Sequence, residues 1–412
     1  MATLYITIPS YVRISINGQN NTFILIIGSI IYKEDCRIFL LTKLWNGERR
    51  SMKIEASLDD LDIKILLELE KGGTKVSTTD ISKNLDIPGR TIRYHMNKLR
   101  ESGILKAPKI QTYERKLGLG ERIILLQSIP ERENELFEIL NKINIFYHFS
   151  TTYGRYDGYL VYTMFPLVNP RITNQIADEL KEKGLIKDYF IFDAIDYRNK
   201  GAEVKPTLPD YEWKWSDWIR DVEEIMKKGC KFDLRLDEFP QAVRFDLSDI
   251  KILKHMVESN GATLKEISKG LNLSLTQVHK RIKRLEETGV IKGALPVFCP
   301  HKKESVISCF FKSRDNAEKI LCGFFRLPFQ VNFAMESSTK YHVQVVLPQS
   351  ELNSFLSNID IFRKQSEDFF IQVIVKETSK GYTHLLEFYN EKTESWEIPL
   401  NEIIQTIRNS KK

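Results

Sequence analysis

Basic side chains recur at helical spacing in two stretches of the chain, residues 87–104 and 273–290. Apolar residues at positions i, i+4 and i+7 form one face of each predicted helix, and basic residues occupy the other faces. A helix of this kind fits the major groove of DNA, where phosphates attract its charge and base edges can be read. Side chains near the helix start are expected to meet bases, and later ones phosphates. The predicted DNA-binding residues are Arg90, Thr91, Arg93, Tyr94, Asn97, Lys98 and Arg100 in the first stretch, and Thr276, Gln277, His279, Lys280, Arg281, Lys283 and Arg284 in the second.

A purely structural interpretation of these basic faces is the first alternative. Charged helix faces are often simply solvated, and winged helices also serve in interaction scaffolds that do not bind DNA. The two stretches align when residue 90 is placed on residue 276, and cations then recur on the outer faces of both helices although the sequences differ. This recurrence favours double-stranded DNA as the partner.

Each basic stretch follows two other predicted helices. In the first copy, helices are expected from residue 57 or 59 to 72 and from 78 or 79 to 85, and the turn 86–89 leads into the basic helix. Three helices with a short turn before the last form the helix-turn-helix plan. Residues 104–110 are expected to form a wing strand. The plan then repeats, because residues 249–253 have the pattern of residues 62–66.

After each helical unit the periodicity changes to that of a mixed α/β unit. Strands are expected at 122–129, 147–153, 159–165 and 188–194, and helices at 133–143 and 174–183. This βαββαβ order is typical of ferredoxin-like units, and a second one is expected between residues 306 and 375. The predicted fold class is α+β, with two winged helix-turn-helix domains each followed by a ferredoxin-like domain in a tandem duplication.

The expected domain boundaries follow from these patterns. Winged helix-turn-helix domains are placed at 52–112 and 245–300, ferredoxin-like domains at 113–198 and 301–378, a connector with a Trp-rich helix at 199–244, and a tail helix in 379–412. In the connector, Trp213, Trp215 and Trp218 could form a stacking platform, but packing against the neighbouring sheet is favoured because apolar helix residues share their side.

Residues 1–51 are predicted as a β-rich extension with strands at 4–8, 11–16, 23–32 and 37–44. Two interpretations stay open for this segment. It is either a small β-layer or translated upstream sequence, because Met52 stands just before the first motif.

The helical motifs resemble those of the Lrp/AsnC family of bacterial and archaeal transcription regulators. The resemblance rests on LDDLDIKIL at 58–66, ISKNL at 81–85 and LRESGI at 99–104, and on DIKIL at 249–253, LKEISK at 264–269 and RIKRLEETGVI at 281–291. It implies a regulator whose α/β domain forms dimers and often senses amino acids. Family members usually carry one copy, so the fused halves are expected to act as a pseudo-dimer on half-sites ~34 Å apart, or a multiple of it. The first copy departs from the family pattern at His95, where Arg is usual, and at Pro88, where Ser would cap.

The predicted hairpin at 154–158 has two interpretations. Gly and Asp favour tight turns, so it can be a plain hairpin turn. The family resemblance implies instead an effector loop, with effector-binding residues Gly154, Tyr156 and Asp157 and an amino-acid-like effector whose ammonium group pairs with the aspartate. The corresponding residues 338–342 contain neither Gly nor Asp, so effector binding is not expected in the second half.

An enzyme is the main alternative from a different class. Siroheme decarboxylases resemble this family and share its two-domain plan, with a hairpin motif rich in His and Arg. Here only one of the two hairpins offers a histidine, His342, and a lone histidine such as His148 is more often structural than catalytic. The basic helices would also be unexplained in an enzyme. No catalytic residue, metal or cofactor is therefore expected.

Composition sets the wider limits. The chain has 412 residues, a net charge of +6 and a pI of about 8.8, which permits nucleic acid as a partner without demanding it. The five cysteines, at positions 36, 230, 299, 309 and 322, show no C-x-x-C spacing, so buried free thiols in a reducing cytoplasm are expected. No apolar run is long enough to span a bilayer, so no membrane partner is expected. Homo-oligomers formed through the α/β faces are a further expectation.

Overall fold

The computed structural model describes residues 6–8, 12–16, 23–27, 58–72, 76–205, 213–259, 262–299 and 303–410. The chain divides into two units, Met1–Arg50 and Ser51–Lys412. In the first unit, β1 (Ile6–Ile8), β2 (Val12–Ile16) and β3 (Phe23–Ile27) form an antiparallel sheet in sequence order. These strands confirm three predicted ones in shorter form. The fourth, at 37–44, lies outside the described residues.

The first helical unit contains α1 (Asp60–Gly72), α2 (Thr78–Leu85) and α3 (Gly89–Glu101). Their apolar faces meet around the fully buried residues Ile65, Ile81 and Ile92. Asp86 follows the last residue of α2, and its left-handed backbone makes the sharp turn towards α3. The predicted helix-turn-helix is confirmed.

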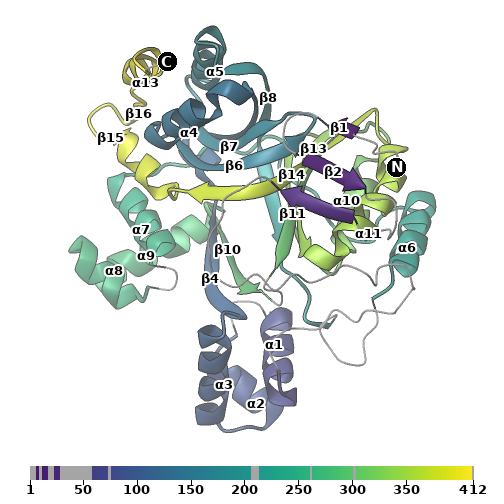
Figure 1. Cartoon of the computed structure of the whole chain (residues 1–412). Coiled ribbons are helices and arrows are strands. Elements are labelled where there is room, and N and C mark those ends of the chain that lie inside the picture. Colours follow the sequence, from purple (N-terminus) through teal and green to yellow (C-terminus); the bar gives the residue numbers. More distant parts are fainter. Residues whose placement is uncertain are drawn as a thin grey trace, which may run out of the picture. The chain divides into compact units, whose positions relative to one another are not determined.

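The second helical unit repeats this plan with α7 (Leu247–Glu258), α8 (Leu264–Leu271) and α9 (Leu275–Glu287). Ile252, Ile267 and Val278 form its centre. Asn272 takes the left-handed position that Asp86 takes in the first unit. Figure 1 shows α1–α3 and α7–α9 as two separate groups. The predicted duplication of this unit is confirmed.

The strand after each unit pairs with its counterpart from the other half. Strand β4 (Leu105–Thr112) and strand β10 (Ile291–Phe298) form a two-stranded antiparallel sheet. Strand β4 lies where the wing strand was predicted, and β10 holds the equivalent place in the second half, but the partner of each comes from the other half of the chain. A single strand leaves its backbone groups unpaired, and the duplication supplies an equivalent strand to pair with.

Each half continues into a ferredoxin-like unit, as predicted. The first consists of β5 (Leu119–Ser128), α4 (Glu133–Lys142), β6 (Phe146–Gly154), β7 (Gly158–Pro166), α5 (Ile172–Glu182) and β8 (Ile186–Ala194). The second consists of β11 (Glu304–Lys312), α10 (Ala317–Phe325), β12 (Gln330–Ser337), β13 (Lys340–Pro348), α11 (Leu352–Asn358), α12 (Asp360–Arg363) and β14 (Asp368–Ser379).

The two ferredoxin-like units share one nine-stranded sheet. Its order is β8-β5-β7-β6-β14-β11-β13-β12-β9, where β9 (Asp196–Lys200) follows β8 directly in the chain. Within this sheet the two halves therefore meet at two strand pairs, β6–β14 and β12–β9. Aromatic and aliphatic residues from both units form one cluster, in which the rings of Phe192 and Phe310 are 5.9 Å apart. The α/β part of the chain is thus joined as a single body.

The connector helix α6 (Trp215–Lys228) packs on the second ferredoxin-like unit. Trp218 is buried there and donates a hydrogen bond to the carbonyl of Gly323 in α10 at 3.0 Å. The tryptophans therefore pack on this unit as predicted, but on its helices rather than directly on the sheet, since Trp215 contacts Phe355 of α11 and Trp218 contacts Phe362 of α12.

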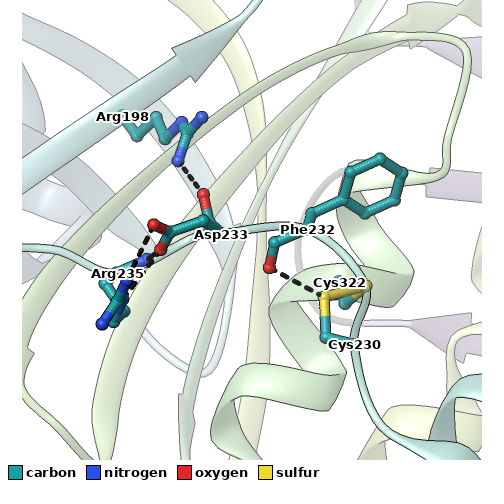
Figure 2. The surroundings of a disulfide bond; sticks show 6 residues. All are labelled: Arg198, Cys230, Phe232, Asp233, Arg235 and Cys322. Atoms are coloured by element: carbon teal, nitrogen blue, oxygen red, sulfur yellow. Dashed lines mark hydrogen bonds and ion pairs between the residues drawn. A yellow bond between two sulfur atoms is a disulfide. The ribbon is translucent and has the colours of Figure 1, made fainter.

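The cysteine prediction is wrong for two residues. Cys230, just after α6, and Cys322, in α10, form a disulfide with their Cα atoms 5.8 Å apart (Figure 2). They are separated by 92 residues, so only the packing of α6 on α10 brings them together. Cys299 and Cys309 are free thiols, and Cys36 lies outside the described residues.

Among the described residues, no helix combines the length and the apolar character that crossing a membrane requires.

Candidate nucleic-acid interface

Helices α3 and α9 have the amphipathic faces that the sequence predicts. Ile92, Met96 and Leu99 of α3 are buried, as are Val278 and Leu285 of α9. Both helices are followed by a glycine in the left-handed region, with φ of 75° at residue 103 and 71° at residue 289. The faces that carry the basic residues point away from these cores.

The two helices begin differently. Ser274 caps α9 by accepting a hydrogen bond from the backbone N–H of Gln277 at 3.2 Å, and the Gln277 Oε1 atom accepts one from the N–H of Ser274 at 2.8 Å. Pro88 precedes α3 and makes no side-chain cap. Gln277 is thus engaged at its amide oxygen, which a paired contact with adenine would also need.

Several of the predicted DNA-binding cations form ion pairs inside their own unit. In the first unit, Lys98 Nζ lies 2.7 Å from Asp62 Oδ2 and 2.9 Å from Asp59 Oδ2. The Nδ1 atom of His95 lies 2.8 Å from the other oxygen of Asp62, whose side chain is fully buried. Partial burial works to raise the pKa of Asp59, but hydrogen bonds from Lys98 and from the backbone of Asp62 outweigh it and hold the pKa at about 2.

The second unit has the same network with two arginines. Arg281 Nη1 lies 2.9 Å from both Asp246 Oδ1 and Asp249 Oδ1, and Arg284 pairs with the other oxygen of Asp249. Asp249, like Asp62, is fully buried. These ion pairs therefore hold α3 against the start of α1, and α9 against the start of α7. Contacts of Lys98, Arg281 and Arg284 with DNA stay predictions, and the structure gives all three residues a role in holding their helix.

The first of these networks also contains a set of metal-type ligands. Donor atoms of Asp59, Asp62 and His95 lie within 4.8 Å of one another. Lys98 already contacts both carboxylates, so a metal ion would have to displace it. In the second unit arginines occupy the positions of His95 and Lys98, although both units fold alike. The donor set therefore fits an ion-pair network better than a metal site.

The remaining predicted residues are mostly accessible. Arg90, Arg93, Thr276, His279 and Lys280 are exposed and make no side-chain hydrogen bond or ion pair with the rest of the described chain. Tyr94 is 66% exposed, and Thr91 is half-buried.

Two of the accessible cations have weak local partners. Arg100 donates a hydrogen bond to the side chain of Asn97 at 3.2 Å, and Lys283 lies 3.6 Å from Glu287. These partners are exposed and sit on the same helix, so they leave both cations accessible to solvent.

The predicted effector residues form a closed hairpin turn. The Oδ1 atom of Asp157 accepts a hydrogen bond from the N–H of Gly154 at 3.0 Å. A Cβ atom on Gly154 would lie 2.3 Å from the carbonyl oxygen of Ile371, so this position requires glycine. The ring of Tyr156 packs between Phe190 and Phe370 from the two halves. The turn interpretation accounts for all of these contacts, and effector binding stays a prediction.

The hairpin histidine of the second half lies against the aromatic cluster that both ferredoxin-like units share. His342 is buried, and its ring centroid is 4.6 Å from that of Phe310. Burial lowers the pKa of His342 to about 3, so its imidazole is neutral at neutral pH. His148 has a polar neighbour, since its Nε2 atom lies 3.2 Å from the hydroxyl of Ser150.

A cluster of contacts between the two-stranded β4–β10 sheet and the nine-stranded sheet was not predicted from the sequence. Lys292 of β10 pairs with Asp196 of β9, and its Nζ atom lies 4.1 Å and 4.3 Å from the ring centroids of Tyr113 and Tyr197. Burial lowers the pKa of Lys292, and Asp196 opposes that effect. These contacts join the two-stranded sheet to the nine-stranded sheet, because Lys292 lies in β10 and its partners Asp196 and Tyr197 lie in β9. A basic residue just after a recognition helix carries no local signal of such a role.

Comparison with known sequences supports the interpretation of both helical units. A family model described as winged helix-turn-helix DNA-binding matches residues 58–106 and 245–292. The regulatory protein AsnC of Haemophilus influenzae is 28% identical over 131 residues, which cover 30% of this chain and 87% of that protein. An uncharacterized HTH-type transcriptional regulator of Pyrococcus furiosus is 31% identical over 106 residues, covering 25% of this chain and 71% of that protein.

A similar arrangement exists among solved structures. The crystal structure of the siroheme decarboxylase NirDL aligns with a TM-score of 0.52 and covers 84% of this chain and 100% of that one. The sequence identity is 14%, so the likeness concerns the fold alone.

Proposed function

We propose that this chain, which belongs to the Lrp/AsnC family of DNA-binding transcriptional regulators, binds duplex DNA with α3 and α9 at the same time, as a fused pseudo-dimer. One observation carries the proposal. On the corresponding outer face of each of the two equivalent helices, cations are exposed without an ion pair in the described chain, while equivalent ion pairs to Asp62 and Asp249 hold each helix in place.

The pairing of the two halves within one chain supports the pseudo-dimer. Strands β4 and β10 follow directly after α3 and α9 and pair with each other, and the ferredoxin-like units share their sheet. Two separate chains would need an intermolecular interface to make the same contacts, whereas the fusion makes them intramolecular. Such a pair would address half-sites ~34 Å apart along the duplex, or a multiple of that distance.

Phosphate contacts would supply most of the affinity. Arg100, Lys280 and Lys283 are exposed and lie on the proposed DNA face, so each can replace a counterion on the duplex. Residues nearer the helix starts, among them Arg90 and Arg93, would face base edges.

A small amino-acid-like effector would bind at the first hairpin. The carboxylate of Asp157 is exposed there and has one oxygen in the turn, which leaves the other for an ammonium group. Titration calorimetry with free amino acids tests this part separately. Heat of binding should appear with the native chain and disappear with Asp157→Asn, and its absence with the native chain would remove the effector from the proposal.

Fluorescence anisotropy with a labelled duplex across a salt series tests the main proposal. Binding should weaken linearly on a log–log scale as salt rises. A variant with Arg90, Arg93, Lys280 and Lys283 changed to Ala should lose both affinity and salt dependence. The matched control changes Lys187, Lys227, Arg363 and Lys364 to Ala, which removes the same charge from exposed positions outside α3 and α9.

Two outcomes would contradict the proposal. If the control variant loses as much affinity as the recognition-helix variant, net charge explains the binding and the two helices do not. If the native chain shows no salt-dependent binding at all, the alternative of a tetrapyrrole enzyme is examined by absorbance, where a Soret band of the purified protein would support it.

A further inference from the structure

Helices α3 and α9 occupy equivalent places but expose different chemistry. When residue 90 is aligned with residue 276, several accessible positions carry side chains of different chemistry on the two helices. The aligned pairs are Arg90 with Thr276, Arg93 with His279, Tyr94 with Lys280, and Asn97 with Lys283.

The guanidinium groups are decisive, because an arginine reads guanine through two parallel hydrogen bonds to its O6 and N7 atoms. On α3, Arg90 and Arg93 stand near the helix start, exposed and without an ion pair in the described chain. On α9, both arginines are occupied, since Arg281 and Arg284 pair with the buried Asp249. Accessible guanidinium groups at a helix start are therefore found on α3 and not on α9.

The other groups on α9 suit the DNA backbone better than the bases. Lys280 and Lys283 are point charges without the fork geometry of arginine, and they neutralise phosphates without distinguishing sequences. Gln277 could recognise adenine, but its amide oxygen is held by the N–H of Ser274 at 2.8 Å in the helix cap. Reading a base with both amide atoms would break this cap.

We infer that the two helices divide the work on DNA: α3 reads guanines in its half-site through Arg90 and Arg93, and α9 mainly adds sequence-independent affinity through Lys280 and Lys283. This inference rests on the proposed function. The preferred site is then asymmetric, because one half-site contains guanine and the other tolerates most sequences. The chain binds such a site in a single orientation.

Selection of preferred duplexes from a random library, followed by anisotropy on the selected site and on a random duplex, tests the inference. The selected sequences should show one informative half-site that contains guanine. The variant with Arg90→Lys and Arg93→Lys keeps the charge but loses the paired hydrogen bonds. It should bind the selected site at least tenfold more weakly, with little change on the random duplex or in the salt slope.

The matched variant carries Lys280→Ala and Lys283→Ala. It should weaken binding to both duplexes by a similar factor and make the salt slope shallower by about 2. Circular dichroism checks that both variants keep the native helix content, which is expected because all four positions are exposed.

The outcomes separate this inference from the function on which it rests. Two equally informative half-sites, or an unchanged ratio of specific to random affinity in the Arg→Lys variant, would overturn the division of work and leave DNA binding intact. A native chain that binds neither duplex in a salt-dependent way would overturn both.

Discussion

The two helix-turn-helix units have the same elements but are held by different surroundings. Ile250 and Leu285 of the second unit belong to the large core of the first ferredoxin-like unit, together with Leu385 and Leu386 of η6 (Thr383–Phe388), a short helix in the C-terminal tail. The first unit has a core of its own, to which β4, β10 and Val204 add a few residues. The two copies therefore share the fold of the unit itself and differ in the contacts that surround it.

The tail adds polar contacts to the second unit as well. Lys254 of α7 pairs with Glu387, and the Thr383 hydroxyl donates to Glu258 at 2.8 Å. We therefore expect the second unit to unfold with the ferredoxin-like body and the first unit to open more independently.

Removing the apolar contacts of the tail should have the largest effect. Leu385 and Leu386 are almost fully buried, so changing both to Ala should cost about 4 kcal/mol or more of the free energy of unfolding. Hydrogen exchange should become faster in α7–α9 and stay unchanged in α1–α3. Equal acceleration in both helical units would contradict the comparison.

The buried aspartates should differ in how far their loss spreads. Asp249→Asn leaves Arg284 without its anion, leaves Arg281 with Asp246 alone and weakens the cap of α7, so we expect a loss of about 2–3 kcal/mol in global urea unfolding. Asp62→Asn removes the equivalent partner of Lys98 and His95. Its effect should appear as local opening of α1–α3 in limited proteolysis, with little change in the global midpoint. A matching fall of the global midpoint in both variants would show that the units are equally coupled.

His342 should make global stability depend on pH. Its pKa of about 3 in the folded chain lies below the ordinary value of about 6.5, so the unfolded chain binds a proton that the folded chain excludes. Stability is therefore full above pH ~6.5 and falls as the pH drops towards 3, by about 2 kcal/mol at pH 5. Urea unfolding of the native chain and of His342→Leu, at pH 5 and above pH ~6.5, measures this loss of stability. An equal loss in both proteins would assign the pH dependence to other groups.

Much of the fold follows from local sequence patterns, because each element carries its own signal. The periodicity of residues 87–104 and 273–290 predicts α3 and α9, and the change of period predicts both βαββαβ units. The pairing of β4 with β10 could not be predicted in this way, because nothing within a strand of this kind specifies a partner in the other half of the chain. The same limit applies to the Cys230–Cys322 disulfide.

The sequence predicted which basic residues lie on the two helices, but not which of them are accessible and which form ion pairs inside their unit. Lys98, Arg281 and Arg284 have the same residue types and helical spacing as the accessible cations, so the sequence alone groups them together. Their separation depends on the buried carboxylates of Asp62 and Asp249, which come from other helices. From the sequence, an aspartate near a helix start predicts a helix cap. The folded structure shows in addition that Asp62 and Asp249 form ion pairs with α3 and α9.

The caps of the two recognition helices should show the smallest effect, and they allow a reciprocal exchange. Ser274→Ala removes the cap of α9 and should cost about 1 kcal/mol. Pro88 has φ of −55° and ψ of 133°, an extended backbone that a capping serine can adopt, so Pro88→Ser should stabilise the start of α3 by about 0.5 kcal/mol. Hydrogen exchange in the first turn of each helix measures both changes. If Pro88→Ser speeds exchange in α3 instead, the rigid proline itself holds the turn before the helix, and the two helix starts are then stabilised by different means rather than to different degrees.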